Sequence, residues 1–291
     1  MFNSIAADYD KLNHIMSLDI DKSWRKRALR RILKSTRDER RDGREIDGKR
    51  RLRSIEVLDV ACGTGDFSIA IAEAMRKIAK DSSDSGKADA MGHVTGVDLS
   101  EGMLEVMKDK VAKAGLEDLI SCETGDCENL RFPDNSFDRV TVAFGVRNFE
   151  NREKGLREML RVLKPGGKLV ILELSVPSNA FMRWLFNLYF LHILPLIGGS
   201  ISGDKAAYRY LPASVLNFPG KKEFSSILRD CGYAAVSHKA FTLGICRMYV
   251  GIKPQESTLQ PLTAASTSAE RLSLSRASGM AASTGARNEI I

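Results

Sequence analysis

The chain has 291 residues, of which 43% are hydrophobic, and a formal net charge of +7. Such a length suits one large α/β domain with additions, and such a composition is that of an ordinary globular protein. The charge is local, because the segment 22–53 holds fifteen Lys and Arg against five Asp and Glu. We interpret this segment as a solvated helix face running into a loop, or as a surface attracted to anionic lipid headgroups. It does not indicate nucleic-acid binding, since Trp24 is the one aromatic residue within it.

The cysteines and the amino-terminal residues indicate the cellular compartment of the protein. Five cysteines without a CxxC pair argue against a disulfide framework or a zinc site, and for a reducing compartment. The sequence opens without a charged region followed by an apolar stretch, so no secretory signal is predicted. We therefore expect a cytoplasmic protein without a metal, with peripheral contact at the inner face of the cytoplasmic membrane left open.

Apolar runs bounded by turn residues alternate with helical patterns between residues 55 and 175. Before them the sequence predicts lid helices over residues 1–34 and a charged loop over 35–54. The strands expected in the alternating region are Glu56–Ala61, Val94–Asp98, Ile120–Glu123, Phe137–Phe144 and Lys168–Leu174. The helices expected between them are Asp66–Lys80, Gly102–Ala114 and Arg152–Leu163, the last one ended by the segment 164–167 (KPGG). Such alternation predicts right-handed crossovers and a parallel sheet.

The carboxyl-terminal part completes the sheet. Two strands, Ala234–Ala240 and Ile245–Lys253, are joined by a short connection and predict an antiparallel hairpin at the sheet's edge. The expected fold is α/β, a doubly wound, mostly parallel sheet of seven strands with an antiparallel last strand. We divide it into a cofactor-binding core over 55–175 and substrate-side helices with the hairpin over 176–254. A polar insertion over 80–92 and a disordered tail over 255–291 lie outside this plan.

The segment 59–66 (DVACGTGD) follows the first predicted strand and opens the first predicted helix. Open parallel sheets bind ligands at this edge, so Asp59, Gly63, Thr64 and Gly65 are predicted to bind a cofactor. The glycines let the backbone turn tightly and approach the ligand, and the helix amides behind them can receive a carboxylate.

The same loop distinguishes two kinds of cofactor. Where pyrophosphate binders have a third Gly or Ala, this chain has Ser68. The acid Asp66 would repel a pyrophosphate, but it could meet the ammonium group of a methionine moiety. We therefore predict S-adenosyl-L-methionine rather than a dinucleotide.

Acids at later strand ends complete the predicted cofactor site. Asp98 ends the second strand, where a carboxylate accepts the ribose hydroxyls. The alternative for Asp98 is a helix N-cap, a role that Ser100 fills better. After the third strand, Asp126 could bond the adenine amine and Cys127 could line the ring.

Three further segments resemble the ubiquinone/menaquinone-biosynthesis C-methyltransferases, and the resemblance covers about residues 1–253. They are 9–27 (YDKLNHIMSLDIDKSWRKR), 132–177 with its AFGVRNF stretch, and 208–219. The resemblance implies a class I Rossmann-like methyltransferase fold, with cofactor contacts at Thr64, Asp98, Asp126 and Cys127. Where many members have a serine after the fourth strand, this chain has Ala143, so one hydrogen bond near the cofactor is lost or comes from the backbone.

The resemblance also implies the reaction, methylation of a ring carbon on a prenylated quinol. The quinol expected is demethylmenaquinol, in menaquinone biosynthesis. The predicted catalytic residues are Arg147, Tyr9 and Asn13, with further candidates for the ring pocket in Asn148, Tyr208 and Arg209.

Each predicted catalytic residue has an alternative interpretation. The cation of Arg147 could stabilise a developing phenolate or orient a water molecule that takes the proton. Alternatively, Arg147 pairs with an acid such as Glu150. For Tyr9 and Asn13 the alternative is a lid helix that packs on itself, and His14 and His192 are weaker candidates as bases.

The segment 180–198 is the most hydrophobic stretch of the chain, but polar residues interrupt it and it is barely long enough to span a membrane. It is expected to form a core helix, a lining for the isoprenoid tail, or a helix at the bilayer surface. Other functions stay open: the ubiquinone-pathway 2-methoxy-6-polyprenyl-benzoquinol methylase, a methyltransferase for another lipid or phenol, or a non-catalytic component that binds the cofactor. A homo-oligomer is also possible.

Overall fold

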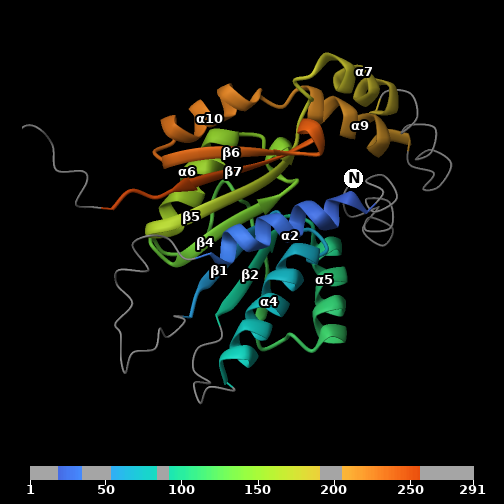
Figure 1. The fold of residues 1–291 in the computed structure, drawn as a ribbon. Helices are drawn as coiled ribbons and strands as arrows, with labels where there is room; N and C mark the ends of the chain where they lie inside the picture. The colour runs from blue at the N-terminus through green and yellow to red at the C-terminus, as the bar shows by residue number, and fades with distance from the viewer. Residues whose placement is uncertain (1–18, 35–53, 84–91, 191–204, 256–291) are drawn as a thin grey trace, which may run out of the picture. The chain divides into compact units, whose positions relative to one another are not determined.

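The computed structural model describes residues 19–34, 54–83, 92–190 and 205–255. The helices and strands described belong to one compact unit, Met1–Pro254 (Figure 1). In chain order they are α2 (Ile20–Leu33), β1 (Glu56–Val60), α4 (Asp66–Ser83), β2 (His93–Asp98), α5 (Glu101–Ala114), β3 (Ile120–Thr124), β4 (Phe137–Ala143), η1 (Val146–Asn148), α6 (Arg152–Val162), β5 (Leu163–Leu174), α7 (Ala180–Leu188), α9 (Lys205–Leu216), α10 (Lys221–Asp230), β6 (Ala234–Phe241), η3 (Thr242–Gly244) and β7 (Cys246–Ile252).

Seven strands form one sheet in the order β3-β2-β1-β4-β5-β7-β6. Strands β1 to β5 pair in parallel, whereas β7 pairs antiparallel with both β5 and β6. This arrangement confirms the predicted doubly wound sheet with its reversed last strand. The short connection η3 returns the chain as a hairpin, so β6 forms the edge and β7 lies inside it.

Helices cover both faces of the sheet, with α2, α4 and α5 on one side and α6 and α10 on the other (Figure 1). A hydrophobic core lies on each face of the sheet, and side chains along β5 point alternately into one core and the other. Val170 and Leu172 pack with residues of α2 and α4, while Leu169 and Ile171 pack with residues of α6 and α10. A strand buried on both faces reads as a continuous apolar run, which is the pattern seen in this sequence.

Strand β5 begins earlier than the predicted Lys168, because it follows α6 directly at Leu163. Leu163 already pairs with Phe137 of β4, and a register shift follows. The ammonium of Lys164 lies 2.7 Å from a carboxylate oxygen of Asp138. The glycine-rich segment that ends the helix is therefore also the first part of the strand.

Helix α2 is the part of the predicted lid (residues 1–34) that the structure describes. Its side chains Trp24, Ala28 and Ile32 are buried in the core beneath the sheet. The indole Nε1 of Trp24 donates a hydrogen bond of 2.9 Å to Thr242 Oγ1, at the far end of the chain. The described part of the predicted lid is thus a structural layer.

Two buried cations bind the carboxyl end of α2. Arg139 Nε donates to the carbonyl of Ile32 at 2.9 Å, and Lys168 Nζ donates to the carbonyl of Lys34 at 2.6 Å. The last carbonyls of a helix lack partners within it and carry partial negative charge, so cations there are stabilising. These two strand residues explain why α2 packs where it does.

Several predicted segments fall partly or wholly outside the described residues. These are the loop 35–54 except Ser54, the insertion 80–92 between Ser83 and Gly92, the tail 255–291 beyond Gln255, and the second half of the apolar segment 180–198. In the described half of the basic segment, the side chains of Lys22, Lys26, Arg27 and Arg30 are exposed, as on a solvated helix face.

The apolar segment begins with α7, which lies with α9 at one end of the sheet (Figure 1). Phe186 and Phe190 stack at a centroid distance of 4.1 Å and pack with Val215 of α9. The opposite side of α7 is open, since Phe181 is 67% and Trp184 61% exposed. Among the helices described, none combines the length and the hydrophobicity that crossing a membrane requires.

Candidate functional site

The glycine loop lies at the carboxyl edge of the sheet, between β1 and α4. The backbone N–H of Cys62 donates to the carbonyl of Val97 at 3.1 Å, which fastens the loop to β2. The N–H of Gly65 donates to the Cys62 carbonyl at 3.0 Å and closes a tight turn. Thr64 is buried between them. The loop therefore stands where the first two strands end, as predicted for a ligand site.

Two left-handed glycines give the loop its form. Gly63 has a φ of +57° and Gly65 a φ of +80°, conformations that side chains with a Cβ rarely adopt. A Cβ on Gly65 would collide with the side chain of Met107 on α5, whereas a Cβ on Gly63 would meet open space. Gly65 is thus needed for packing, and Gly63 leaves its backbone accessible to a ligand.

Asp98 ends β2 and faces this loop. Its Oδ2 accepts the N–H of Gly63 at 2.8 Å, and its Oδ1 accepts the N–H of Ser100 at 2.9 Å. Ser100 caps α5, because its hydroxyl accepts the N–H of Met103 at 3.3 Å. Burial raises the pKa of Asp98. A carboxylate has about four lone pairs, so Asp98 keeps acceptor capacity for a ribose hydroxyl beside these backbone donors.

Asp59 is the most deeply buried acid of the predicted cofactor site. Its Oδ2 accepts the hydroxyl of Ser68 at 2.6 Å, while its Oδ1 has no hydrogen-bond partner among the described residues. Burial raises the pKa of this carboxyl to about 7. An unpartnered buried carboxylate oxygen beside the glycine loop fits a cationic group such as an ammonium. Ser68, which argued against a pyrophosphate, therefore orients this acid.

Asp66 has a different role from the predicted one. Its carboxylate forms ion pairs with Arg25 of α2, at 2.6 Å, and with Lys110 of α5. Burial acts to raise the pKa of Asp66, but the charges of Arg25 and Lys110 outweigh it and hold the pKa below its usual value. Two cations therefore already neutralise Asp66, whereas Asp59 keeps a carboxylate oxygen without a partner among the described residues.

The turn after β3 carries Asp126 and Cys127. Asp126 is exposed, and its Oδ1 accepts the N–H of Glu128 at 2.8 Å. Burial and the charges of Asp126 and Glu128 raise the pKa of the Cys127 thiol to about 12. The thiol is therefore neutral, as a wall against an adenine ring should be. Ala143, the last residue of β4, is half-buried and packs against the core on the α2 side.

Arg147 lies in η1, directly after β4, and it is held by an acid that the sequence did not single out. Its Nη1 lies 2.8 Å from Oε1 of Glu173, and its backbone N–H donates to Oε2 of the same residue at 3.1 Å. Both side chains are buried. The predicted partner Glu150 is exposed instead. An acid in the otherwise apolar strand 168–174 (KLVILEL) is the signal that could have identified Glu173.

Arg147 also binds the backbone beside it. Its Nη1 donates to the carbonyl of Phe144, a residue held at a φ of +62°. Its Nε is buried without a partner, and among the described residues no hydrogen bond reaches its Nη2. One side of the guanidinium is therefore fixed, and the other keeps donors for a ligand.

The other substrate-side candidates are only partly described. Tyr9, Asn13, His14 and His192 lie outside the described residues, and so do the side chains of Tyr208 and Arg209. Asn148 does face α9, where its Oδ1 accepts the hydroxyl of Tyr210 at 3.0 Å. Tyr210 belongs to segment 208–219, so this segment of the resemblance contacts η1, which follows β4.

Comparison with known proteins identifies the family of the chain. A profile described as the ubiE/COQ5 methyltransferase family matches residues 1–253. The demethylmenaquinone methyltransferase of Bacteroides fragilis is 39% identical over 253 residues, which cover 87% of this chain and 91% of that protein. The ubiquinone/menaquinone biosynthesis C-methyltransferase UbiE of Geobacter sulfurreducens is 41% identical over 253 residues, 87% of each protein.

The fold is also similar to solved structures of methyltransferases. The phosphoethanolamine N-methyltransferase 2 of Haemonchus contortus, in complex with S-adenosyl-L-methionine, superposes with a TM-score of 0.52. It is 15% identical, and the match covers 80% of this chain and 53% of that one. By its family the chain uses S-adenosyl-L-methionine as its cofactor, and the unpartnered carboxylate oxygen of Asp59 and the accessible loop at Gly63 fit it. The chain belongs to the ubiE/COQ5 methyltransferase family and is an S-adenosylmethionine-dependent methyltransferase.

Proposed function

We propose that this protein methylates a ring carbon of demethylmenaquinol, a prenylated quinol, to give menaquinol. Both kinds of curated relative are named for quinone intermediates, and the profile match covers the substrate-side segments as well as the cofactor core. The observation that carries the proposal in the structure is the buried pair of Arg147 and Glu173. It stands at the carboxyl ends of β4 and β5, on the sheet edge that holds the glycine loop.

The cofactor, when bound, supplies an electrophilic methyl group on a sulfonium. The chain's own residues would hold and orient it: Asp98 would accept hydroxyls, and Asp59 would accept the ammonium through its unpartnered oxygen. A quinol carbon becomes nucleophilic when a neighbouring hydroxyl loses its proton, so the site must stabilise a phenolate. Arg147 can donate to that oxygen from its Nη2, and Glu173 fixes the guanidinium in the required orientation.

Tyr9 and Asn13 remain predicted members of the ring pocket, on the strength of the resemblance in segment 9–27. Asn148 and Tyr210 give the pocket a described polar wall next to Arg147. We propose that these groups align the ring with the methyl group, since proximity and orientation supply a large part of such a barrier reduction.

The isoprenoid tail needs an apolar surface, and α7 offers one. Phe181 and Trp184 stack at a centroid distance of 6.2 Å on its open side, where Leu185 and Leu188 are also exposed. Exposed aromatic and aliphatic groups gathered on one helix are typical of a helix that lies at a bilayer surface. We propose peripheral membrane contact through this face, which would bring the protein to its lipid substrate.

A transfer assay tests the proposed reaction. The full-length protein is incubated with methyl-labelled S-adenosylmethionine and demethylmenaquinone, with and without reduction to the quinol. Because only the quinol is electron-rich at the accepting carbon, label should enter menaquinone in the reduced sample alone. The Glu173→Gln variant serves as a control of matched size.

Lipid extracts from quinone-pathway mutants supply the competing substrates. Label entering a ubiquinone precursor, with none in menaquinone, would contradict the proposed substrate. Cofactor binding measured by calorimetry without transfer to either quinol would instead indicate a non-catalytic component.

A further inference from the structure

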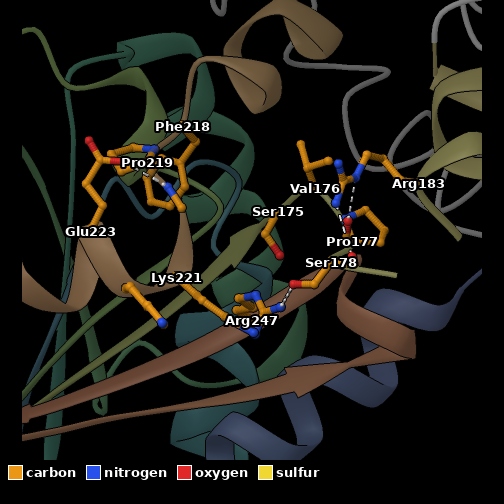
Figure 2. Close-up of a pocket in the computed structure, with 12 residues that line it drawn as sticks. Ser175, Val176, Pro177, Ser178, Arg183, Phe218, Pro219, Lys221, Glu223 and Arg247 are labelled. Atoms are coloured by element: carbon orange, nitrogen blue, oxygen red, sulfur yellow. Dashed lines mark hydrogen bonds between the residues drawn. The ribbon is translucent and has the colours of Figure 1, made fainter. Parts of the chain in front are cut away.

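A cavity lies where the loop after β5 meets the start of α10. It has a volume of about 480 Å³. Figure 2 shows its lining, which comes from the loop after β5, the first turn of α7, the turn that opens α10, and β7. Its walls combine apolar residues with four cations and one acid: Val176, Pro177, Phe218, Pro219, Arg183, Lys221, Lys222, Arg247 and Glu223.

Arg247 is the central observation. It lies in β7 and is only 6% exposed, yet it forms no ion pair within the part of the chain that the structure describes. Its Nη2 donates one hydrogen bond, of 3.3 Å, to the neutral hydroxyl of Ser178. Glu173, opposite Arg247 in the β5–β7 register, gives its carboxylate to Arg147. A buried cation that forms no ion pair is costly, so an anion from outside would stabilise it.

The other cations extend the positive charge around the cavity. Arg183 is tethered at its mouth, donating from Nε to the carbonyl of Pro177 at 3.2 Å and from Nη2 to that of Ser178 at 3.1 Å. Lys221 and Lys222 begin α10, whose free amides add partial positive charge at the same place. The single acid, Glu223, accepts the N–H of Gly220 at 3.3 Å and caps the helix.

The positive charge of the cavity acts on the neighbouring side chain of His238. Burial lowers the pKa of His238, and the charges of Arg247 and Lys221 lower it further. The planar donors of arginine match the oxygens of a carboxylate or a phosphate in pairs, and four cations around one cavity favour the more highly charged phosphate.

We propose that this cavity binds the phosphate group of a phosphate ester. Its volume exceeds that of a single phosphate, and Phe218, Pro219 and Val176 give the remaining space apolar walls, which suits an ester with an apolar portion. The inference goes beyond methyl transfer, since neither the quinol nor the methyl donor carries a phosphate. The phosphate comes either from a soluble ester or from the headgroup of an anionic lipid.

Charge-removing variants of the full-length protein test the proposal. Lys221→Ser/Lys222→Ser removes two surface charges of the cavity without touching the core, and Arg247→Met removes the buried one at similar length. Lys108→Ser/Lys113→Ser is the matched control, because these exposed lysines lie on α5 at the other end of the sheet. Circular dichroism melts establish which variants fold.

Calorimetry measures the affinity for inorganic phosphate and for glycerol 3-phosphate, and co-sedimentation compares phosphatidylcholine vesicles with and without phosphatidylglycerol. We expect the cavity variants to weaken binding by about tenfold or more, the loss expected for one charge-assisted hydrogen bond, with no change in the control. Binding of glycerol 3-phosphate alone identifies a soluble ester as the source. Binding that depends on phosphatidylglycerol, and that glycerol 3-phosphate competes away, identifies a headgroup.

Two results would overturn the proposal. One is no binding of either soluble probe together with no dependence on phosphatidylglycerol. The other is an equal loss in the control and the cavity variants, which would indicate attraction to the basic surface in general. Neither result bears on methyl transfer to the quinol, which is measured separately.

Discussion

At the scale of single residues, Asp59 is the acid whose environment matters most. Its Oδ1 is buried without a partner among the described residues, and burial raises its pKa to about 7. The carboxyl is therefore partly protonated near neutral pH, whereas an ammonium ligand requires the carboxylate. The affinity for the cofactor should accordingly depend on this titration.

We expect the affinity for S-adenosylmethionine to rise as the pH increases from about 6 to about 8, because deprotonated Asp59 accepts the ammonium. In Asp59→Asn the affinity should fall by about tenfold and lose this part of its pH dependence. Calorimetry at several pH values measures both. If the affinity of Asp59→Asn rose with pH as much as that of the wild type, the pH dependence would belong to another group.

Glu173 and Arg147 form the other residue-scale unit. The Glu173→Gln substitution nearly keeps the shape of the side chain, but it removes the negative charge that fixes the guanidinium of Arg147. We expect kcat to fall roughly 10- to 100-fold, with KM for the cofactor little changed, because positioning at the reacting ring is lost. Steady-state kinetics separate the two constants.

The matched control is Glu150→Gln, which removes the exposed acid three residues after Arg147 in the sequence. It should leave kcat unchanged. If both variants lowered kcat to the same extent, kcat would depend on negative charge near Arg147 in general and not on the contact with Glu173.

At the scale of elements, α2 acts as a structural layer. Trp24 is buried and hydrogen-bonded to Thr242, so the helix joins the start of the chain to η3. We expect Trp24→Ala to lower the free energy of unfolding by about 3–5 kcal/mol, through the cavity it leaves. Trp24→Phe should cost less, since it keeps most of the packing and loses about 1 kcal/mol with the hydrogen bond.

Urea unfolding measures both changes in α2, and Lys26→Ala on the exposed side of the helix is the control. A Trp24→Ala variant as stable as that control would mean that α2 does not contribute to the core.

Helix α7 has two unlike faces, and its open face gives a separate prediction. Phe181→Ser/Trp184→Ser should leave the melting temperature nearly unchanged, because both side chains are more than half exposed. The same variant should bind less to vesicles that contain quinone, because the apolar contact area is reduced. Co-sedimentation at constant salt measures this. Unchanged binding would exclude α7 as the contact.

At the scale of the whole molecule, the pH dependence of stability follows from the same buried acid. Asp59 has a folded-state pKa of about 7, above its ordinary value, so the folded state binds more protons than the unfolded chain between the two values. Its contribution to stability is therefore fully present at acid pH and is lost as the pH rises through about 7. Asp66 acts in the opposite direction, since its lowered pKa makes stability fall at acid pH.

The difference between Asp59→Asn and the wild type isolates this effect. Relative to the wild type, the cofactor-free variant should gain about 2–3 kcal/mol of unfolding free energy between pH 5 and pH 8, because it carries no buried charge to desolvate. Denaturant melts at both values measure it. A difference that stayed constant with pH would show that Asp59 titrates normally in the folded protein.

Most of the sheet could be predicted because its signals are local. Apolar runs of strand length, helical periodicity and turn residues placed the strands of the cofactor core, and only β5 began well before its predicted start. The glycine loop and Asp98 were equally readable, since a backbone turn and a strand-end acid are encoded in a few consecutive residues. Pairs such as Arg25 with Asp66 were not, because the two residues lie on elements that meet only after folding.

The amino-acid sequence was thus sufficient for the fold class, the cofactor and the position of the glycine loop at the carboxyl edge of the sheet. Only the tertiary structure decided which charges neutralise one another. It assigned Asp66 to Arg25 and Lys110, gave Arg147 the acid Glu173, and left Arg247 buried beside a cavity. The physical reason is that an ionic contact depends on distance and burial in three dimensions, whereas secondary-structure patterns depend on neighbours along the chain.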